Sequence, residues 1–477
     1  MKRMSRKQCF AGSGRPVDET LVRELRDFLS EAPEYVCVAR RQHRRFKAGD
    51  FSLSSCAGYL EFQSSDLRIR IVPGGWNRTT HRFIARGRLG GLLLKPSRKN
   101  ELWLLRQRFR WHCEEEICRH WKLIRSGFVH RSAGGAFLRM ILQRREQRFA
   151  AIAVADEEKI RAEAALAQLL TLWNKAEQKG GSIHGGLMFL SQQLATSAAR
   201  LASDLCAPIR IFQFPQLSEV ALPSTPQVPL LWPSQSSREG LKSLTADLSL
   251  PPEVQAIIRN GKEWSFEYLG IPFAQFLTDQ QCWRLPLLSK DLGADGAEAR
   301  LQVRDECHRI RGMRRARSRS RHDPLYQLYS ERWLESLILR NPKALDPQLR
   351  LFPIYSQVPA YVSQRRVIDI VAITESGRLT VIEVKVQKSI DLLLQGLAYW
   401  RIVFQAQQEN AFQKNGYFDS LRVSEEPPLL YCVTPLLSLH ADQRLFARHL
   451  RPEVEVYLIG VNNDWRNGIS VLRKERL

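Results

Sequence analysis

The chain has no apolar run near the roughly 18 residues that a membrane-spanning helix needs. Its longest apolar stretches, such as Phe149–Ala155, have the length of a strand. No apolar segment follows the basic first residues, so we expect no secretion signal and no membrane partner. The nine cysteines are scattered and odd in number, which is typical of reduced thiols. We therefore expect a cytoplasmic protein.

Acidic residues are also few: 49 Asp and Glu stand against 72 Lys and Arg, a net charge of +23. The excess is uneven, with 32 basic and 14 acidic residues in 1–150 but 19 and 17 in 323–477. A strongly basic chain indicates a polyanionic partner, most simply nucleic acid. The imbalance predicts that binding and a second activity lie in different domains.

At roughly 100–200 residues per domain, 477 residues predict two to four domains. Between Pro215 and Ser237, five prolines and five serines indicate a linker. We predict four segments in this order: a basic β-rich region (1–100), an α/β domain (101–214), a linker with a small module and an Arg-rich tether (215–322), and a second α/β domain (323–477).

Two basic stretches are candidates for nucleic-acid contact. Seven of the thirteen residues in Arg309–Arg321 are arginine, which favours a solvated tether and leaves a phosphate-binding arm as the alternative. Around 66–88, arginines alternate with apolar residues, as in a basic β-surface or an ordinary soluble β-domain. The candidate contact residues are Arg314, Arg315, Arg317, Arg319, Arg68 and Arg70.

Residues 325–461 predict the order α-β-β-β-α-β-α-β, with helices over 325–340 and 391–406 and the first strands over 351–362, 366–374 and 378–386. Residues 101–214 predict the same order. Ala165–Trp173 aligns with Leu392–Trp400, with Gln168 on Gln395 and Trp on Trp. This indicates an internal duplication; the alternative is that two α/β domains share a common layering.

The stretch from Val367 to Lys385 predicts a hairpin about Thr374–Gly377, which brings Asp369 within one residue of Glu383. Strand alternation then puts Glu383 and Lys385 on one face. Paired carboxylates suit Mg²⁺, and a metal beside an ammonium suits phosphodiester hydrolysis. The alternative is a plain surface salt bridge, although charges are costly in so apolar a strand.

Asp369, Glu383-x-Lys385 and the Gln395-x-x-x-Tyr399 helix together resemble the PD-(D/E)xK nuclease superfamily, especially RecB-like and NucS-type endonuclease domains. The resemblance covers roughly 325–460 and implies a restriction-endonuclease-like αβββαβ core that uses Mg²⁺ or Mn²⁺. It implies Asp369, Glu383 and Glu335 as metal ligands, Lys385 as the catalytic lysine and Gln395 and Tyr399 as supporting residues. Ile368 replaces the proline that names the motif.

The leading hypothesis is therefore a metal-dependent nuclease, with DNA favoured over RNA. The alternatives are a non-catalytic nucleic-acid-binding protein on nuclease-like folds and an interaction scaffold without nucleic acid. The upstream copy has no acid to match Asp369, and Phe149–Ala155 carries neither carboxylate nor lysine. We expect that copy to be inert. Cutting both strands of a duplex would favour a homodimer.

Overall fold

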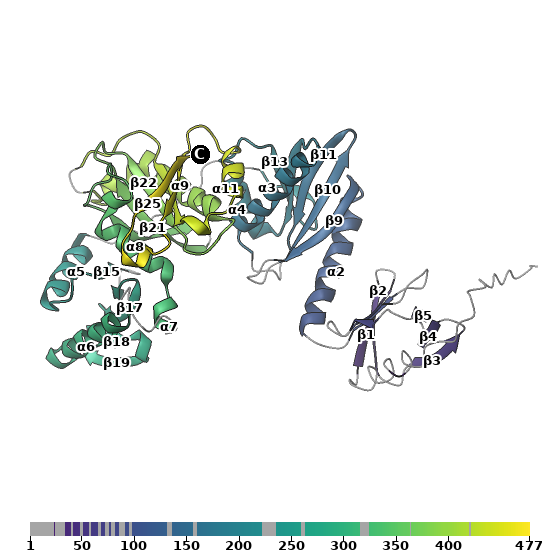
Figure 1. Ribbon diagram of the computed structural model, residues 1–477, viewed down its shortest axis with the longest axis horizontal. Helices are drawn as coiled ribbons and strands as arrows, with labels where there is room; N and C mark the ends of the chain where they lie inside the picture. Colours follow the sequence, from purple (N-terminus) through teal and green to yellow (C-terminus); the bar gives the residue numbers. More distant parts are fainter. Residues whose placement is uncertain are drawn as a thin grey trace, which may run out of the picture. The chain divides into compact units, whose positions relative to one another are not determined.

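The structure is a computed structural model of all 477 residues (Figure 1). Its residues are described with side chains over 101–129, 136–155, 160–221, 240–258, 263–314, 324–359, 367–418 and 421–477. Only the backbone is described for most strand residues before 100 and for 98–100, 130, 235–239, 360–362 and 364–366. Among the residues described, no helix combines the length and apolarity needed to cross a bilayer.

Residues Met1–Trp121 form one compact unit, in which the described backbone is mainly strand. Two antiparallel sheets have the orders β2-β1-β8-β7-β6 and β3-β4-β5, and helix α2 (Arg98–Ile117) follows them. The strands are β1 (Glu34–Ala39), β2 (Gln42–Lys47), β3 (Phe51–Cys56), β4 (Tyr59–Ser64), β5 (Arg68–Ile71), β6 (Trp76–Asn77), β7 (Arg82–Ile84) and β8 (Gly91–Leu94).

Residues Lys122–Leu477 form the second unit, an α/β structure with three mixed or antiparallel sheets interleaved with helices. The first sheet has the order β14-β13-β12-β11-β10-β9. Its elements are β9 (Lys122–His130), β10 (Ala136–Arg144), β11 (Gln147–Ala153), α3 (Ala162–Gln178), β12 (Gly185–Leu190), α4 (Gln192–Ala202), β13 (Ile209–Gln213) and β14 (Ser218–Glu219).

A small antiparallel sheet, ordered β15-β16-β17-β18-β19, accounts for the module that the sequence leaves without an interpretation. Helix α6 packs on four of its five strands, and its apolar residues join those of α8 in one core. The elements are α5 (Gln235–Asp247), β15 (Val254–Ile258), β16 (Glu263–Tyr268), β17 (Ile271–Leu277), β18 (Cys282–Leu285), β19 (Lys290–Ala294) and α6 (Ala297–Met313), with the short 3₁₀ turn Pro286–Leu288.

The third sheet runs in sequence order from β20 to β25 and holds the candidate site. Tyr329 adopts φ +51° and breaks the helix expected over 325–340 into two. The elements are α7 (Pro324–Gln327), α8 (Ser330–Arg340), β20 (Tyr355–Val362), β21 (Gln364–Ile373), β22 (Leu379–Val384), α9 (Leu392–Gln408), α10 (Ala411–Lys414), β23 (Leu429–Pro435), α11 (Asp442–Ala447), β24 (Glu455–Val461) and β25 (Val471–Arg476), with 3₁₀ turns at Pro342–Ala344, Leu436–Ser438 and Trp465–Asn467.

The first and third sheets share one design. Each begins with three antiparallel strands, continues after a helix with two parallel strands and ends with an antiparallel edge strand. In both, the long helix lies between the third and fourth strands of the sequence: α3 in the first and α9 in the third. Every pairing has the same sense in the two sheets.

The long helices of these two domains pack against each other, so one apolar core serves both. Polar contacts cross the same boundary: Thr171 Oγ1 lies 3.2 Å from Asp442 Oδ2, and Arg401 Nε donates to Asp204 Oδ2 at 3.0 Å. Cys206 N also donates to His449 O at 2.7 Å. The helices are therefore a layer shared between two sheets.

Candidate active site

The candidate site lies where β21 and β22 separate. Their last paired residues are Ile370 and Ile382, so Asp369 and Glu383 come next, on facing strands. Asp369 does not continue the ladder; its Oδ2 accepts a hydrogen bond from Val384 N at 2.9 Å. The sequence-based placement of Asp369 within one residue of Glu383 is confirmed.

Lys385 follows the end of β22 and turns back to Glu383. Its Nζ donates to Glu383 Oε1 at 2.9 Å and lies 3.6 Å from Glu331 Oε2. Val384, between them, packs into the core on the other side of the sheet, as strand alternation predicts. Glu331 lies in the first turn of α8, and its ion pair with Lys385 has no sequence signal.

The carboxylates are held in an apolar environment. Glu383 is fully buried, and burial followed by the nearby charge of Asp369 raises its pKa well above the usual range. Burial also raises the pKa of Asp369, although Lys385 opposes the shift. For Lys385, burial lowers the pKa, but the negative charges of Glu383 and Asp369 outweigh it and raise the pKa. The site thus contains more acidic groups than its one lysine can compensate.

Glu335 is brought to the same place by α8, which packs on β20 and β22. Its carboxylate is nearly inaccessible, and burial followed by the charge of Asp369 raises its pKa to about 8. Gln357 Nε2 donates to Glu335 Oε2 at 2.8 Å, and Arg332 Nε lies 3.7 Å from the same oxygen. Sequence reasoning missed both of these neighbours.

The small module contributes a further carboxylate. Glu267 of β16 is fully buried and pairs with Arg332 of α8. The turn that follows β16 presses on α8, since a Cβ on Gly270 would lie 2.3 Å from Arg332 Cβ. Gly270 also has φ +80°, a conformation that favours glycine. The module therefore supports the helix that presents Glu335.

Helix α9 covers the site from the other side. A Cβ on Gly396 would lie 2.9 Å from Leu430 Cδ1 and 3.4 Å from Glu383 Cβ, so this glycine lets α9 approach the strand. The neighbouring Gln395 is half-buried, and its Nε2 lies 3.3 Å from Tyr399 Oη. The helix thus brings both expected supporting residues beside the strand of Glu383.

The donor set fits a hard divalent cation. Glu383 Oε2 is buried and accepts no hydrogen bond from a donor of the described residues, so a bound cation would satisfy it. In the described part of the chain, no group of three or more His, Cys, Asp or Glu side chains could hold a metal alone. Two carboxylates suffice for Mg²⁺, which keeps several waters and binds substrate phosphates. Glu335 as a third ligand stays a prediction.

Arg314 does not contact solvent, contrary to the expectation that it binds nucleic acid. Its guanidinium is buried over the Trp333 ring and donates to four backbone carbonyls, those of Leu269, Leu325, Leu328 and Tyr329. Burial, together with Arg466, lowers the pKa of Arg314 to about 9. The expectation is wrong because an arginine with all these carbonyl partners stabilises the fold. Arg315, Arg317 and Arg319, and the side chains of Arg68 and Arg70, lie outside the described residues.

The two mixed sheets can be aligned at the end of their third strands. Lys385 N donates to Val433 O at 3.0 Å, just beyond the last pair of β22 and β23. Val154 N donates to Phe189 O at 3.2 Å, just beyond the last pair of β11 and β12. Val154 therefore occupies the position of Lys385.

The same alignment gives the positions of the two carboxylates. Ile152, two residues before Val154, takes the place of Glu383. Arg139 pairs with Ile152 across the antiparallel ladder and so takes the place of Asp369. All three aligned positions thus lack the side chain that the third sheet carries.

Packing of the long helices supports this alignment. In the third sheet, Gly396 of α9 meets Leu430 of β23. In the first, Leu169 of α3 meets Gly186 of β12, where a Cβ would lie 2.8 Å from Leu169 Cδ2. The large and small residues have exchanged places at one helix–strand contact.

No family model, curated protein or solved structure matches the chain.

Proposed function

We propose that residues 324–477 are the catalytic domain of a metal-dependent nuclease of the PD-(D/E)xK type, acting on DNA in preference to RNA. The observation that carries the proposal is the meeting of Asp369, Glu383 and Lys385 where β21 and β22 separate. The sheet around them follows the order helix, three antiparallel strands, helix, parallel strand, which fits a restriction-endonuclease-like core.

Asp369 and Glu383 would hold Mg²⁺ or Mn²⁺, and Glu335 completes the acidic set as a third ligand or as a neighbour of Asp369. A metal bound there polarises a phosphoryl oxygen and lowers the pKa of a bound water. The charge of Lys385 stabilises negative charge that develops on the phosphate and orients the attacking water. Gln395 and Tyr399 position the site from α9.

The first sheet supports the proposal as an internal comparison. A structural salt bridge would have no reason to occur in one copy together with a second buried carboxylate. The copy that lacks the acids also lacks the lysine, as expected if the three residues act as a unit. We infer that the two domains arose by duplication and that residues 122–221 do not cut.

Cleavage of labelled single-stranded DNA, duplex DNA and RNA, with Mg²⁺, Mn²⁺ or EDTA, tests the proposal. Asp369→Ala and Lys385→Ala should each reduce cleavage by at least about hundredfold, because each removes charge stabilisation at the reacting phosphate. Lys414→Ala is the matched control, since Lys414 is exposed and its Nζ donates to the Glu409 carbonyl, outside the site.

Melting curves of every variant would show whether the fold survives. Metal-dependent cutting that persists in both site variants would disprove the assignment of the site. Binding without any cutting by the wild-type chain would instead favour a nucleic-acid-binding protein on a nuclease-like fold.

A further inference from the structure

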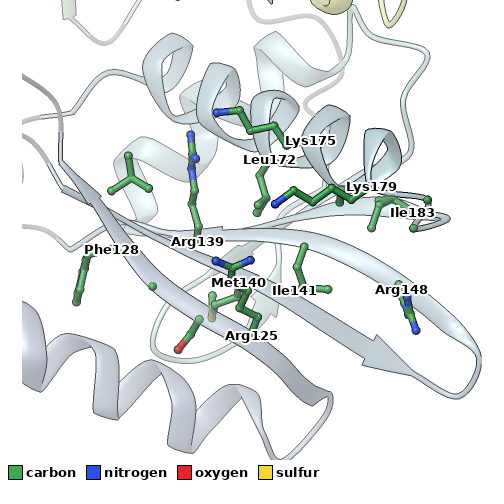
Figure 2. A pocket seen from close by; sticks show the side chains of 16 residues that line it. Arg125, Phe128, Arg139, Met140, Ile141, Arg148, Leu172, Lys175, Lys179 and Ile183 are labelled. Atoms are coloured by element: carbon green, nitrogen blue, oxygen red, sulfur yellow. The ribbon is translucent and has the colours of Figure 1, made fainter.

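The first sheet has a pocket of about 490 Å³ whose lining includes Arg139, the residue aligned with Asp369. The pocket lies between the C-terminal half of α3 and strands β9, β10 and β11 (Figure 2). Apolar atoms of Phe128, Ile141 and Leu172 form part of its wall. Nothing in the proposed cleavage reaction uses this space.

The charged residues that line the pocket are all basic, with none acidic. They are Arg125, Arg139, Arg148, Lys175 and Lys179. Figure 2 shows four of them around the space between helix and sheet, while Arg148 lies toward the far end of the hairpin. A concave surface with one sign of charge and apolar walls concentrates the field, so it attracts anions.

One acid outside the pocket lining, Asp442, acts on Arg139, but burial outweighs it and lowers the pKa of Arg139. Local structure explains only part of the remaining cluster. Lys175 and Lys179 stand one helical turn apart, a spacing at which like charges repel. The C-terminal end of α3 favours cations and could account for these two lysines. It does not account for Arg125 and Arg139, which come from neighbouring strands of the sheet.

Arg139 is the residue that most clearly awaits a ligand. It is half-buried and donates through one terminal nitrogen to Gln168 Oε1, while its Nε is buried without a partner among the described residues. Gln168 aligns with Gln395, and Arg139 aligns with Asp369. At this position the first sheet therefore carries the positive charge of Arg139, whereas the third sheet carries Asp369, a carboxylate that can bind a cation.

We propose that this pocket binds a phosphate group of a nucleic-acid backbone, with Arg139 at its base and Arg125, Lys175 and Lys179 around it. A metal-binding carboxylate and an arginine are alternative ways to hold a phosphate, the first through a cation and the second directly. The inert domain would then grip the substrate that its neighbour cuts. The ligand's identity rests on the proposed function, but binding here does not require cleavage.

A nucleic-acid backbone is favoured over a free phosphate compound by the net charge of the first 150 residues of the sequence. Residues 1–150, which include Arg125, Arg139 and Arg148, carry 32 basic and 14 acidic residues. A repeating polyanion can contact many of these basic residues at once, whereas a single small anion cannot.

The test is fluorescence anisotropy of the full chain on labelled duplex and single-stranded DNA in EDTA, across a salt series. The variant K175Q/K179Q should lower affinity about tenfold and reduce the slope of log affinity against log salt by about 2, because two phosphate contacts are lost. R125Q should lower the slope by about 1. The matched control is K290Q/K414Q, with the same charge change at two exposed lysines outside the pocket.

Equal, small losses in the pocket variant and its control would overturn the proposal. A second result would also overturn it. If the pocket variants keep their DNA affinity but lose the thermal shift that a mononucleotide or inorganic phosphate causes in the wild type, the pocket is a small-molecule site. All these side chains are exposed, so folding should survive, and melting curves check this.

The two proposals fail separately. A wild-type chain that never cuts, but whose pocket variants lose affinity and salt slope, would refute the nuclease and leave the phosphate site. A chain that cuts normally and binds equally well without the pocket charges would refute only the phosphate site.

Discussion

Glu383 carries a carboxylate at a place where a charge is costly. It is completely buried, one of its oxygens accepts from Lys385, and the other has no partner in the described part of the chain. Burial and the neighbouring charge of Asp369 outweigh Lys385 and raise the pKa of Glu383, so the charged form is disfavoured. A bound divalent cation would compensate the buried charge of Glu383. The buried carboxylate is therefore understandable as a metal ligand.

The raised pKa values predict how stability should change with pH. The pKa of Glu335 is about 8, and those of Asp369 and Glu383 are also raised. The folded chain therefore binds more protons than the unfolded chain between about pH 4.5 and pH 8, so their contribution to stability is lost as pH rises through this range. In EDTA, the melting temperature of the wild type should fall as pH rises through this range, and it should fall less in Glu335→Gln.

Metal should reverse this trend because the ligands must lose their protons to bind it. The thermal shift produced by Mn²⁺ should grow from pH 6 to pH 8 in the wild type and be absent in Asp369→Ala. A shift that is equal at both pH values, or that survives the substitution, would contradict a carboxylate metal site.

At the scale of elements, the meeting of α9 with β22 and β23 depends on one glycine. Gly396→Leu should destabilise the fold by about 3 kcal/mol, because the new side chain enters a filled core. Leu430→Gly should cost at least as much through the cavity it leaves. The pair mimics Leu169 and Gly186 of the first sheet, so the double variant should lose less than the sum by at least about 1 kcal/mol.

Chemical denaturation of the four proteins measures that coupling. Strict additivity would mean that the two helix–strand contacts are not equivalent, and the alignment of Gln168 with Gln395 would lose its structural support.

The elements that carry the main site could be predicted from sequence because their signals are local. Two apolar runs and the Thr374–Gly377 turn between them fix the register of β21 and β22, and with it the approach of Asp369 to Glu383. Gln357 gave no such signal: it adopts φ +51° without being glycine, where β20 and β21 skip a pair. Glu267 lies 65 positions from its partner, and no pattern links them.

For Arg314, the sequence predicts an exposed nucleic-acid contact where the structure has a buried side chain. A run of arginines is usually solvated, and composition cannot reveal that one member meets the open carbonyls of a turn 11 to 15 residues away. Such contacts depend on the tertiary packing of Trp333 and its neighbours, which acts at longer range than sequence periodicity.

At the scale of the whole molecule, only one of the two aligned sheets carries the acids and the lysine. This predicts one cut per binding event. On supercoiled plasmid, the full chain at low concentration should accumulate nicked circles before linear molecules appear, provided that the proposed nuclease activity on duplex DNA holds. Agarose gel time courses at several protein concentrations distinguish this from paired cutting by a dimer. Linear product without a nicked intermediate, at all concentrations, would contradict it.

The shared helix layer predicts that the C-terminal domain does not fold well alone. A fragment of residues 240–477 loses α3 and leaves the surface of α9 that packs on it exposed. We expect it to aggregate or to bind a hydrophobic dye, whereas residues 122–477, a compact unit, should remain soluble. A soluble 240–477 fragment that melts cooperatively would show that the two domains are independent.

The shared helix layer also gives an evolutionary reason for the domain of the first sheet to be retained. Under the proposed function, substitutions at Ile152 or Val154 leave the reacting residues unchanged, provided that they preserve packing. Damage to Leu166 or Leu170 of α3 disturbs the core that both domains use. Under the proposed nuclease function, selection for cutting would therefore reach residues of α3 outside the site, and the first sheet would remain under the same packing constraint as the third.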